Sequence, residues 1–95
     1  MLSQLPIDLD KVEAKDLDNE ICRAGMIAEL DAVSFYEQMA AKTTNDNLKK
    51  VLLDIGREEK THIGEFEAFL LKGDAEQVAE NQAGSEEVEE IIEGK

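Results

Sequence analysis

The sequence predicts an all-α protein whose centre is an antiparallel hairpin of two long helices. Residues 16–42 and 46–72 are rich in helix-forming residues, and each range carries apolar side chains at steps of three and four. Residues 43–47, which join the two ranges and include the start of the second, are all turn and N-cap residues. Because this connection is so short, we expect the two helices to lie side by side in opposite directions.

The first predicted helix spans residues 16–42. Asp16 or Asp18 is available to cap its start, and Lys42 suits its negatively polarised end. One largely apolar stripe runs along it and contains a single carboxylate near its middle: Cys22, Gly25, Glu29, Ala32, Tyr36 and Met39. Further apolar residues spread around the cylinder, so we expect more than one side of this helix to be buried in an oligomer.

The second predicted helix spans residues 46–72 and ends before Gly73, which is a suitable C′ residue. Its stripe consists of Leu48, Leu52, Ile55, Glu59, His62, Phe66 and Phe69. Glu59 and His62 are therefore expected to interrupt a core seam rather than to lie on a solvated face. An ionised carboxylate in such a seam is costly unless a cation compensates it.

Two less regular segments flank the hairpin in what we interpret as a single domain, residues 1–95. Residues 1–15 predict an extended or loosely turned arm, and its apolar side chains are as compatible with docking on a neighbour as with disorder. Residues 74–93 predict a helical segment that is capped by Asp74 and broken at Gly84-Ser85. We interpret this segment as an assembly helix rather than as part of a reactive site.

Composition excludes several classes of protein. A chain of 95 residues is short for a large hydrophobic core of its own, so we expect it to associate with other chains. The net charge of −13 argues against a surface that binds nucleic acid or an anionic membrane. Cys22 is the single cysteine, which excludes a disulfide scaffold and fits a reducing cytosol. No apolar run approaches the ~20 residues that span a bilayer, so we expect a cytoplasmic protein without membrane contact.

Glu59 and His62 form a Glu-x-x-His motif on the second predicted helix. This spacing places both side chains on one face, about one turn apart, so a carboxylate oxygen and an imidazole nitrogen can reach the same cation. Glu29 lies at nearly the same distance from the turn at Asn45 as Glu59 does, so the three side chains are predicted to converge. Two carboxylates and an imidazole, without a thiolate, suit iron or manganese.

Three ligands from one hairpin are half of the set that a carboxylate-bridged di-iron centre requires. A second copy related by a two-fold axis would supply the other half and form a four-helix bundle with two metal ions on the axis. Gly56 and Gly64 either permit close backbone approach at this junction or only weaken the helix. The predicted chemistry is oxidation of iron(II) by oxygen.

Two other functions fit the same residues. In the first, the protein is a non-catalytic helical assembly in which Glu59 and His62 bind a structural cation or each other, since a Glu-x-x-His motif also arises by chance on acidic helices. In the second, the protein is a related di-metal peroxidase or catalase. Turnover of hydrogen peroxide without net oxidation of iron would distinguish this enzyme from a ferroxidase.

Several residues near the motif have two interpretations. Tyr36 lies two turns beyond Glu29, where it either hydrogen-bonds a ligand and takes part in electron transfer or packs in the core. Asp31 and Glu58 fall on other faces of their helices. We interpret them primarily as solvated charges and secondarily as outer residues that attract cations. Glu65 is interpreted as a plain surface residue.

The segments 27–38 (IAELDAVSFYEQ) and 57–62 (REEKTH) resemble the encapsulated ferritins, short members of the ferritin-like group that are housed inside encapsulin shells. The resemblance covers roughly residues 16–80. It implies that Glu29, Glu59 and His62 are ferroxidase ligands shared across a dimer interface. It also implies that Tyr36 lies close to this centre and that Asp31 matches an acidic position of a metal entry site.

The same resemblance implies a hairpin with a short C-terminal helix that dimerises into a ferritin-like four-helix bundle. Such dimers, each sharing two iron ions, are expected to form a ring-shaped decamer without a storage cavity of its own. The expected activity is oxidation of Fe(II) with O2, and the expected location is an encapsulin nanocompartment in the cytoplasm, whose shell stores the iron. Some archaeal relatives are fused to the shell protein. The shell partner of this chain is therefore either fused to it or a separate protein.

Overall fold

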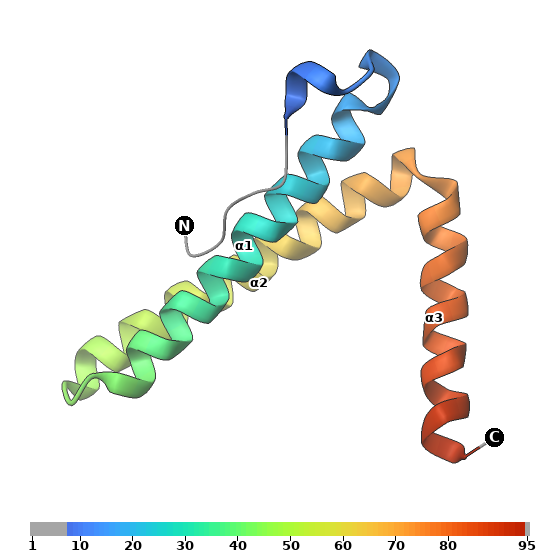
Figure 1. The fold of residues 1–95 in the computed structure, drawn as a ribbon. Helices are drawn as coiled ribbons and strands as arrows, with labels where there is room; N and C mark the ends of the chain where they lie inside the picture. The colour runs from blue at the N-terminus through green and yellow to red at the C-terminus, as the bar shows by residue number, and fades with distance from the viewer. Residues whose placement is uncertain (1–7, 95) are drawn as a thin grey trace.

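The computed structural model describes residues 8–94 and contains three α-helices (Figure 1). They are α1 (Leu17–Lys42), α2 (Asp46–Gly73) and α3 (Ala75–Glu93). The described residues include no β-strand, and the predicted all-α fold class is confirmed. None of these helices is apolar enough along its length to cross a membrane.

Helices α1 and α2 form an antiparallel hairpin and pack along their whole length (Figure 1). The chain reverses direction at Asn45, whose side chain accepts hydrogen bonds from the backbone N–H groups of Asn47 and Leu48, each at 3.1 Å. The backbone N–H of Asn45 donates to Thr43 Oγ1, also at 3.1 Å. These bonds satisfy donors that the first turn of α2 would otherwise leave without partners, and they explain the short turn.

Helix α3 turns away from the hairpin at a sharp corner (Figure 1). Asp74 lies at this corner and uses both carboxylate oxygens. Its Oδ1 accepts a hydrogen bond from the backbone N–H of Gln77 at 2.9 Å, and its Oδ2 lies 3.0 Å from Arg23 Nη2 on α1. Asn19, also on α1, donates from Nδ2 to the carbonyl oxygen of Gly73 at 3.2 Å. The direction of α3 is therefore fixed by side chains of α1.

We expect Asp74→Ala to loosen this corner and to fray the start of α3. Loss of the cap costs about 1 kcal/mol, and loss of the partly exposed ion pair with Arg23 adds less than that. Hydrogen exchange at the Gln77 amide should become faster. Asp74→Asn is the matched control, because asparagine caps a helix as well as aspartate but removes the charge. If both variants exchange equally fast at Gln77, the cap is not what holds this turn.

Helix α3 is continuous, so the predicted break at Gly84-Ser85 is wrong. A side-chain hydrogen bond from Gln82 Nε2 to Glu86 Oε1, at 3.0 Å, spans the glycine. A glycine inside a helix costs roughly 1 kcal/mol, which helix-forming neighbours and such i,i+4 pairs offset. The helix ends instead at Gly94, which has a left-handed φ of 75° that favours glycine.

The predicted N-terminal arm lies partly outside the described residues, which begin at Asp8. From there the chain forms two short 3₁₀ turns, Leu9–Lys11 and Ala14–Asp16, before α1 begins. Asp16 occupies the N-cap position of α1 but makes no capping hydrogen bond with its side chain, and Asp18 lies inside the helix. The start of α1 is therefore not fixed by either of the two aspartates that the sequence suggested.

A single chain buries little apolar surface. Only Cys22, Ala40 and Leu70 are buried apolar residues within the described part. The radius of gyration is 16.8 Å, compared with about 12 Å for a compact chain of this length. The seam predicted to be core is open within one chain, where Phe69 is 61% exposed. Other large apolar side chains that are exposed include Ile21, Leu30, Phe35, Leu48, Val51, Leu53, Val78, Val88, Ile91 and Ile92.

Candidate metal centre

Three side chains that the sequence analysis selected lie together on one side of the hairpin. Glu29 projects from α1, and Glu59 and His62 project from α2. His62 Nδ1 lies 3.4 Å from Glu29 Oε2 and 3.3 Å from Glu59 Oε2. One ligand atom from each residue lies within 4.8 Å of the other two. The two distances from His62 Nδ1 suit ligands of one cation, because ligand atoms that lie about 2.0–2.2 Å from a metal are up to about 4.4 Å apart.

The packing of Phe66 against Gly25 brings the two helices together beside this group. Gly25 lies one turn before Glu29, and a Cβ atom on Gly25 would lie 2.6 Å from the ring of Phe66. The absence of a side chain at Gly25 therefore makes room for the aromatic ring. Gly56 has only an ordinary neighbour, Tyr36 Cβ at 3.6 Å, and Gly64 has nothing within 4 Å. Within one chain, the close approach beside the metal-ligand group lies at Gly25 rather than at Gly56 or Gly64.

Glu29 Oε2 is buried and has no hydrogen-bond partner among the described residues. His62 Nδ1 is near it, but this nitrogen is placed for a hydrogen bond with Glu59. The two cationic side chains next to the motif in the sequence pair elsewhere, since Lys60 Nζ lies 3.1 Å from Glu37 Oε2 and Arg57 pairs with Asp54. A buried carboxylate oxygen without a donor is costly, and a bound cation would compensate it. The residues therefore fit a metal ion.

The donor set also indicates which ions fit. Two carboxylates and one imidazole suit iron or manganese, and the group contains no thiolate. Glu29 and Glu59 side chains are 20% and 19% exposed, whereas His62 is 46% exposed. The group is thus open toward solvent on the His62 side. Three ligands also leave coordination positions on a metal for a substrate or for ligands from a second chain.

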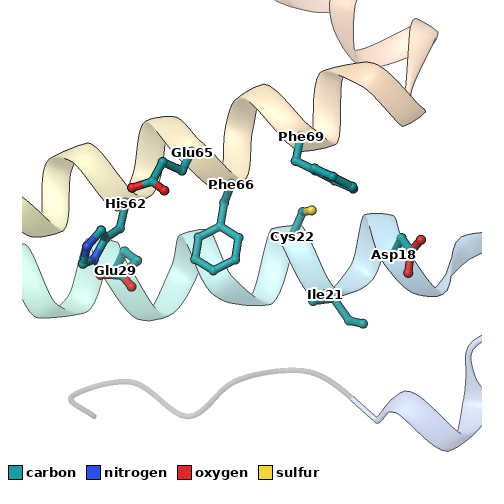
Figure 2. Close-up of a pocket in the computed structure, with 8 residues that line it drawn as sticks. All are labelled: Asp18, Ile21, Cys22, Glu29, His62, Glu65, Phe66 and Phe69. Carbon is teal, nitrogen blue, oxygen red and sulfur yellow. Dashed lines mark ion pairs between the residues drawn. The ribbon is translucent and has the colours of Figure 1, made fainter.

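A groove of about 650 Å³ runs along the hairpin from this group (Figure 2). Its lining is mostly apolar away from the group, and it consists of Asp18, Ile21, Cys22, Glu29, His62, Glu65, Phe66 and Phe69. Glu65 is exposed, as predicted for a surface residue, and it also lines this groove. Its position one turn after His62 was the signal that could have placed it there.

Tyr36 and Asp31 do not belong to the group of three. Tyr36 is half-buried two turns along α1, where its ring meets Phe35 edge-on with centroids 5.4 Å apart. Asp31 follows Glu29 by two residues and so lies on another face of α1, also half-buried. Neither residue supplies an atom to the metal-ligand group found in the described part of the chain.

Comparisons with known proteins identify the family of this chain. The model of the EncFtn-like family matches residues 5–71. The chain belongs to the EncFtn-like family. It is 52% identical over 93 residues to the ferritin-like-encapsulin shell fusion protein of Pyrococcus furiosus. That match covers 96% of this chain and 27% of the relative, so the EncFtn-like chain spans about a quarter of the relative's length.

The EncFtn-like chain is also similar to a solved structure, the crystal structure of the encapsulated ferritin domain from Pyrococcus furiosus. The TM-score is 0.81 at 51% identity, and the match covers 95% of this chain and 94% of that domain. The resemblance predicted from residues 27–38 and 57–62 is thereby confirmed. The family match also reaches into the arm that the resemblance did not include.

Proposed function

We propose that this chain is a ferroxidase that binds Fe(II) through Glu29, Glu59 and His62 and oxidises it to Fe(III) with O2. The observation that carries this proposal is Glu29 Oε2, a buried carboxylate oxygen without a hydrogen-bond partner beside Glu59 and His62. Such an arrangement is costly for an empty site and favourable for a cation. Membership of the EncFtn-like family supports iron as the metal.

We further propose that the working centre is shared by two chains. The open seam and the small buried core of one chain leave apolar surface that a second hairpin can cover. A two-fold axis beside His62 would bring six ligands to two iron ions. Such dimers could then associate further into the ring-shaped decamer that the family resemblance implies.

Each ligand has a definite task in this proposal. Glu29 and Glu59 neutralise the charge of the ions and hold them on the two helices, and His62 supplies a neutral nitrogen ligand on the open side of the group. A bound pair of iron ions supplies the two electrons that reduce O2 to peroxide. Tyr36 would lie near the shared centre, two turns along α1, and Asp31 would attract cations from outside it.

We also propose that the chain works with an encapsulin shell in the cytoplasm, and that the shell stores the oxidised iron. This proposal rests on the family and on the Pyrococcus relative, whose name describes a fusion of a ferritin-like part to an encapsulin shell. The chain spans about a quarter of that relative. This proposal is compatible both with a shell protein that is fused to the chain and with a separate shell protein.

Titration of the metal-free protein with Fe(II) tests the ferroxidase proposal. Stopped-flow absorbance and oxygen uptake should show fast oxidation that saturates at about one iron per chain, as expected for two ions shared by two chains. Oxidation no faster than in protein-free buffer would leave a helical assembly with a structural cation. Rapid turnover of hydrogen peroxide without net oxidation of iron would instead favour a peroxidase or a catalase.

A further inference from the structure

The metal-ligand group of Glu29, Glu59 and His62 is built from two helices. Glu59 and His62 share one turn of α2, so the helix itself fixes their relative placement. Glu29 comes from α1, and its placement depends on how α1 packs against α2. The distance of 3.4 Å between Glu29 Oε2 and His62 Nδ1 is therefore set by contacts between the two helices beside the group.

The contact of Phe66 with Gly25 lies in the layer of the hairpin next to these ligands. Gly25 lies one turn before Glu29 on α1, and Phe66 lies one turn after His62 on α2. Because the helices are antiparallel, both steps lead in the same direction along the hairpin. Figure 2 shows the ring of Phe66 reaching toward α1 between Glu29 and Cys22.

The ring of Phe66 lies flat against the backbone at Gly25. Its atoms Cζ, Cε1 and Cε2 lie 2.6, 2.7 and 2.8 Å from the position that a Cβ atom on Gly25 would take. Three distances this similar mean that the far half of the ring covers Gly25 with its face. Burial of the ring surface opposes separation of the two helices, and the bulk of the ring opposes closer approach.

Two features of the metal-free group favour a wider spacing of the helices. The ligand oxygens of Glu29 and Glu59 lie within 4.8 Å of each other, where two negative charges repel. Glu29 Oε2 is also buried without a hydrogen-bond partner among the described residues, which is costly. Packing between the helices has to offset both effects if the group is to stay assembled without a metal ion.

We propose that Phe66 is a positioning residue of the metal centre. Its ring against Gly25 fixes the spacing of α1 and α2 and thereby holds the metal-ligand group ready for a cation before the cation binds. Phe66 supplies no ligand atom. The contact lies within one chain, so it does not depend on a second hairpin covering the seam. That the bound metal is iron rests on the proposed function, whereas the positioning role applies to any divalent cation that the group binds.

Titration of the metal-free protein with Co²⁺ tests this role without oxidation of the metal. Phe66→Ala should raise the Kd for Co²⁺ by at least about tenfold, as expected for a residue that supports metal ligands. The visible absorption of the Co²⁺-saturated protein should also change, because it depends on the coordination geometry. Phe66→Leu keeps part of the contact and should give intermediate values. Parent-like Kd and absorption in both variants would overturn the proposal.

Leu70→Ala is the matched control for stability. Leu70 is buried on the same helix, one turn beyond Phe66, and its truncation should lower the melting temperature. At a temperature where all variants are folded, its Kd for Co²⁺ and its absorption should match those of the parent protein. If Leu70→Ala weakens binding as much as Phe66→Ala does, general loss of stability explains the effect and the positioning role is wrong.

Phe69→Ala is the control for coverage of the seam. Phe69 lines the same groove as Phe66 but is 61% exposed within one chain. Its loss should therefore weaken Co²⁺ binding less than the loss of Phe66 does. Equal weakening in Phe66→Ala and Phe69→Ala would overturn the proposal, because both rings would then act through the second hairpin.

The same proteins separate the positioning role from the ferroxidase proposal. If the parent protein binds Co²⁺ with the predicted differences among the variants but does not oxidise Fe(II), the positioning role is supported and the ferroxidase proposal fails. If the parent protein oxidises Fe(II) rapidly while Phe66→Ala keeps the parent Kd and absorption, the ferroxidase proposal is supported and the positioning role fails.

Discussion

Glu59→Ala and His62→Ala should each abolish the fast, saturating phase of iron oxidation, leaving only the rate seen in protein-free buffer. Each variant removes one of three ligands from every chain, so a centre shared by two chains loses two of its six. Changes to residues that only support a metal ligand cost roughly 10–100-fold in affinity or activity, and loss of a ligand itself should cost at least as much. Oxygen uptake after addition of Fe(II) measures the effect.

The matched control for these variants is Glu58→Ala. Glu58 is the neighbour of Glu59, is exposed, and points from another face of α2. It should oxidise iron like the parent protein. Sedimentation at several protein concentrations should also show that metal-loaded dimers of the parent dissociate less readily than those of Glu59→Ala. Parent-like oxidation in both Glu59→Ala and His62→Ala would exclude the group as the reactive centre.

Gly25→Val should destabilise the hairpin and disturb the metal group. A Cβ atom at Gly25 would lie 2.6 Å from the ring of Phe66, so the ring or the helix has to move. Overpacking of this kind costs about 1–3 kcal/mol, and the few tenths that valine gains over glycine in a helix offset little of it. For a chain of this size we expect the melting temperature to fall by roughly 5–15 °C. Thermal unfolding followed by circular dichroism measures this change.

Phe66→Leu, added to Gly25→Val, should restore part of the lost stability because the smaller side chain vacates the contact. Gly64→Val is the control at a glycine of α2 that has nothing within 4 Å. It should leave the melting temperature nearly unchanged. A similar fall in Gly64→Val would mean that a β-branched residue weakens either helix, and that the contact with Phe66 is not the cause.

The sequence was sufficient to predict the hairpin because its signals agree with one another. Apolar spacing defines two long helices, and a cluster of polar residues around Asn45 can only form a turn. The convergence of Glu29 with Glu59 and His62 then depends on distances counted from that turn, which a regular helix makes reliable. The roles of these residues stay predictions until metal binding is measured.

Other features depend on contacts that helical periodicity does not determine. The helix-breaking tendency of Gly84 was visible, but the hydrogen bond from Gln82 to Glu86 that spans it depends on side-chain conformation. Likewise, the rotation of each helix about its axis decides that Phe66 lies against Gly25 and that Glu65 faces the groove. The apolar seam was recognisable, and its coverage by a second copy of the chain stays a prediction.

The corner at Asp74 imposes an order on folding. Arg23 and Asn19, which hold this corner, lie 51 and 54 residues away from their partners Asp74 and Gly73 along the chain. Contacts between residues so distant in sequence form only after the intervening loop has closed, here by the pairing of α1 with α2. Helix α3 can therefore form early but acquires its direction last. If copies join through α3, as the sequence predicts, they will fit together only when their hairpins have already folded, which would exclude incompletely folded chains from the assembly.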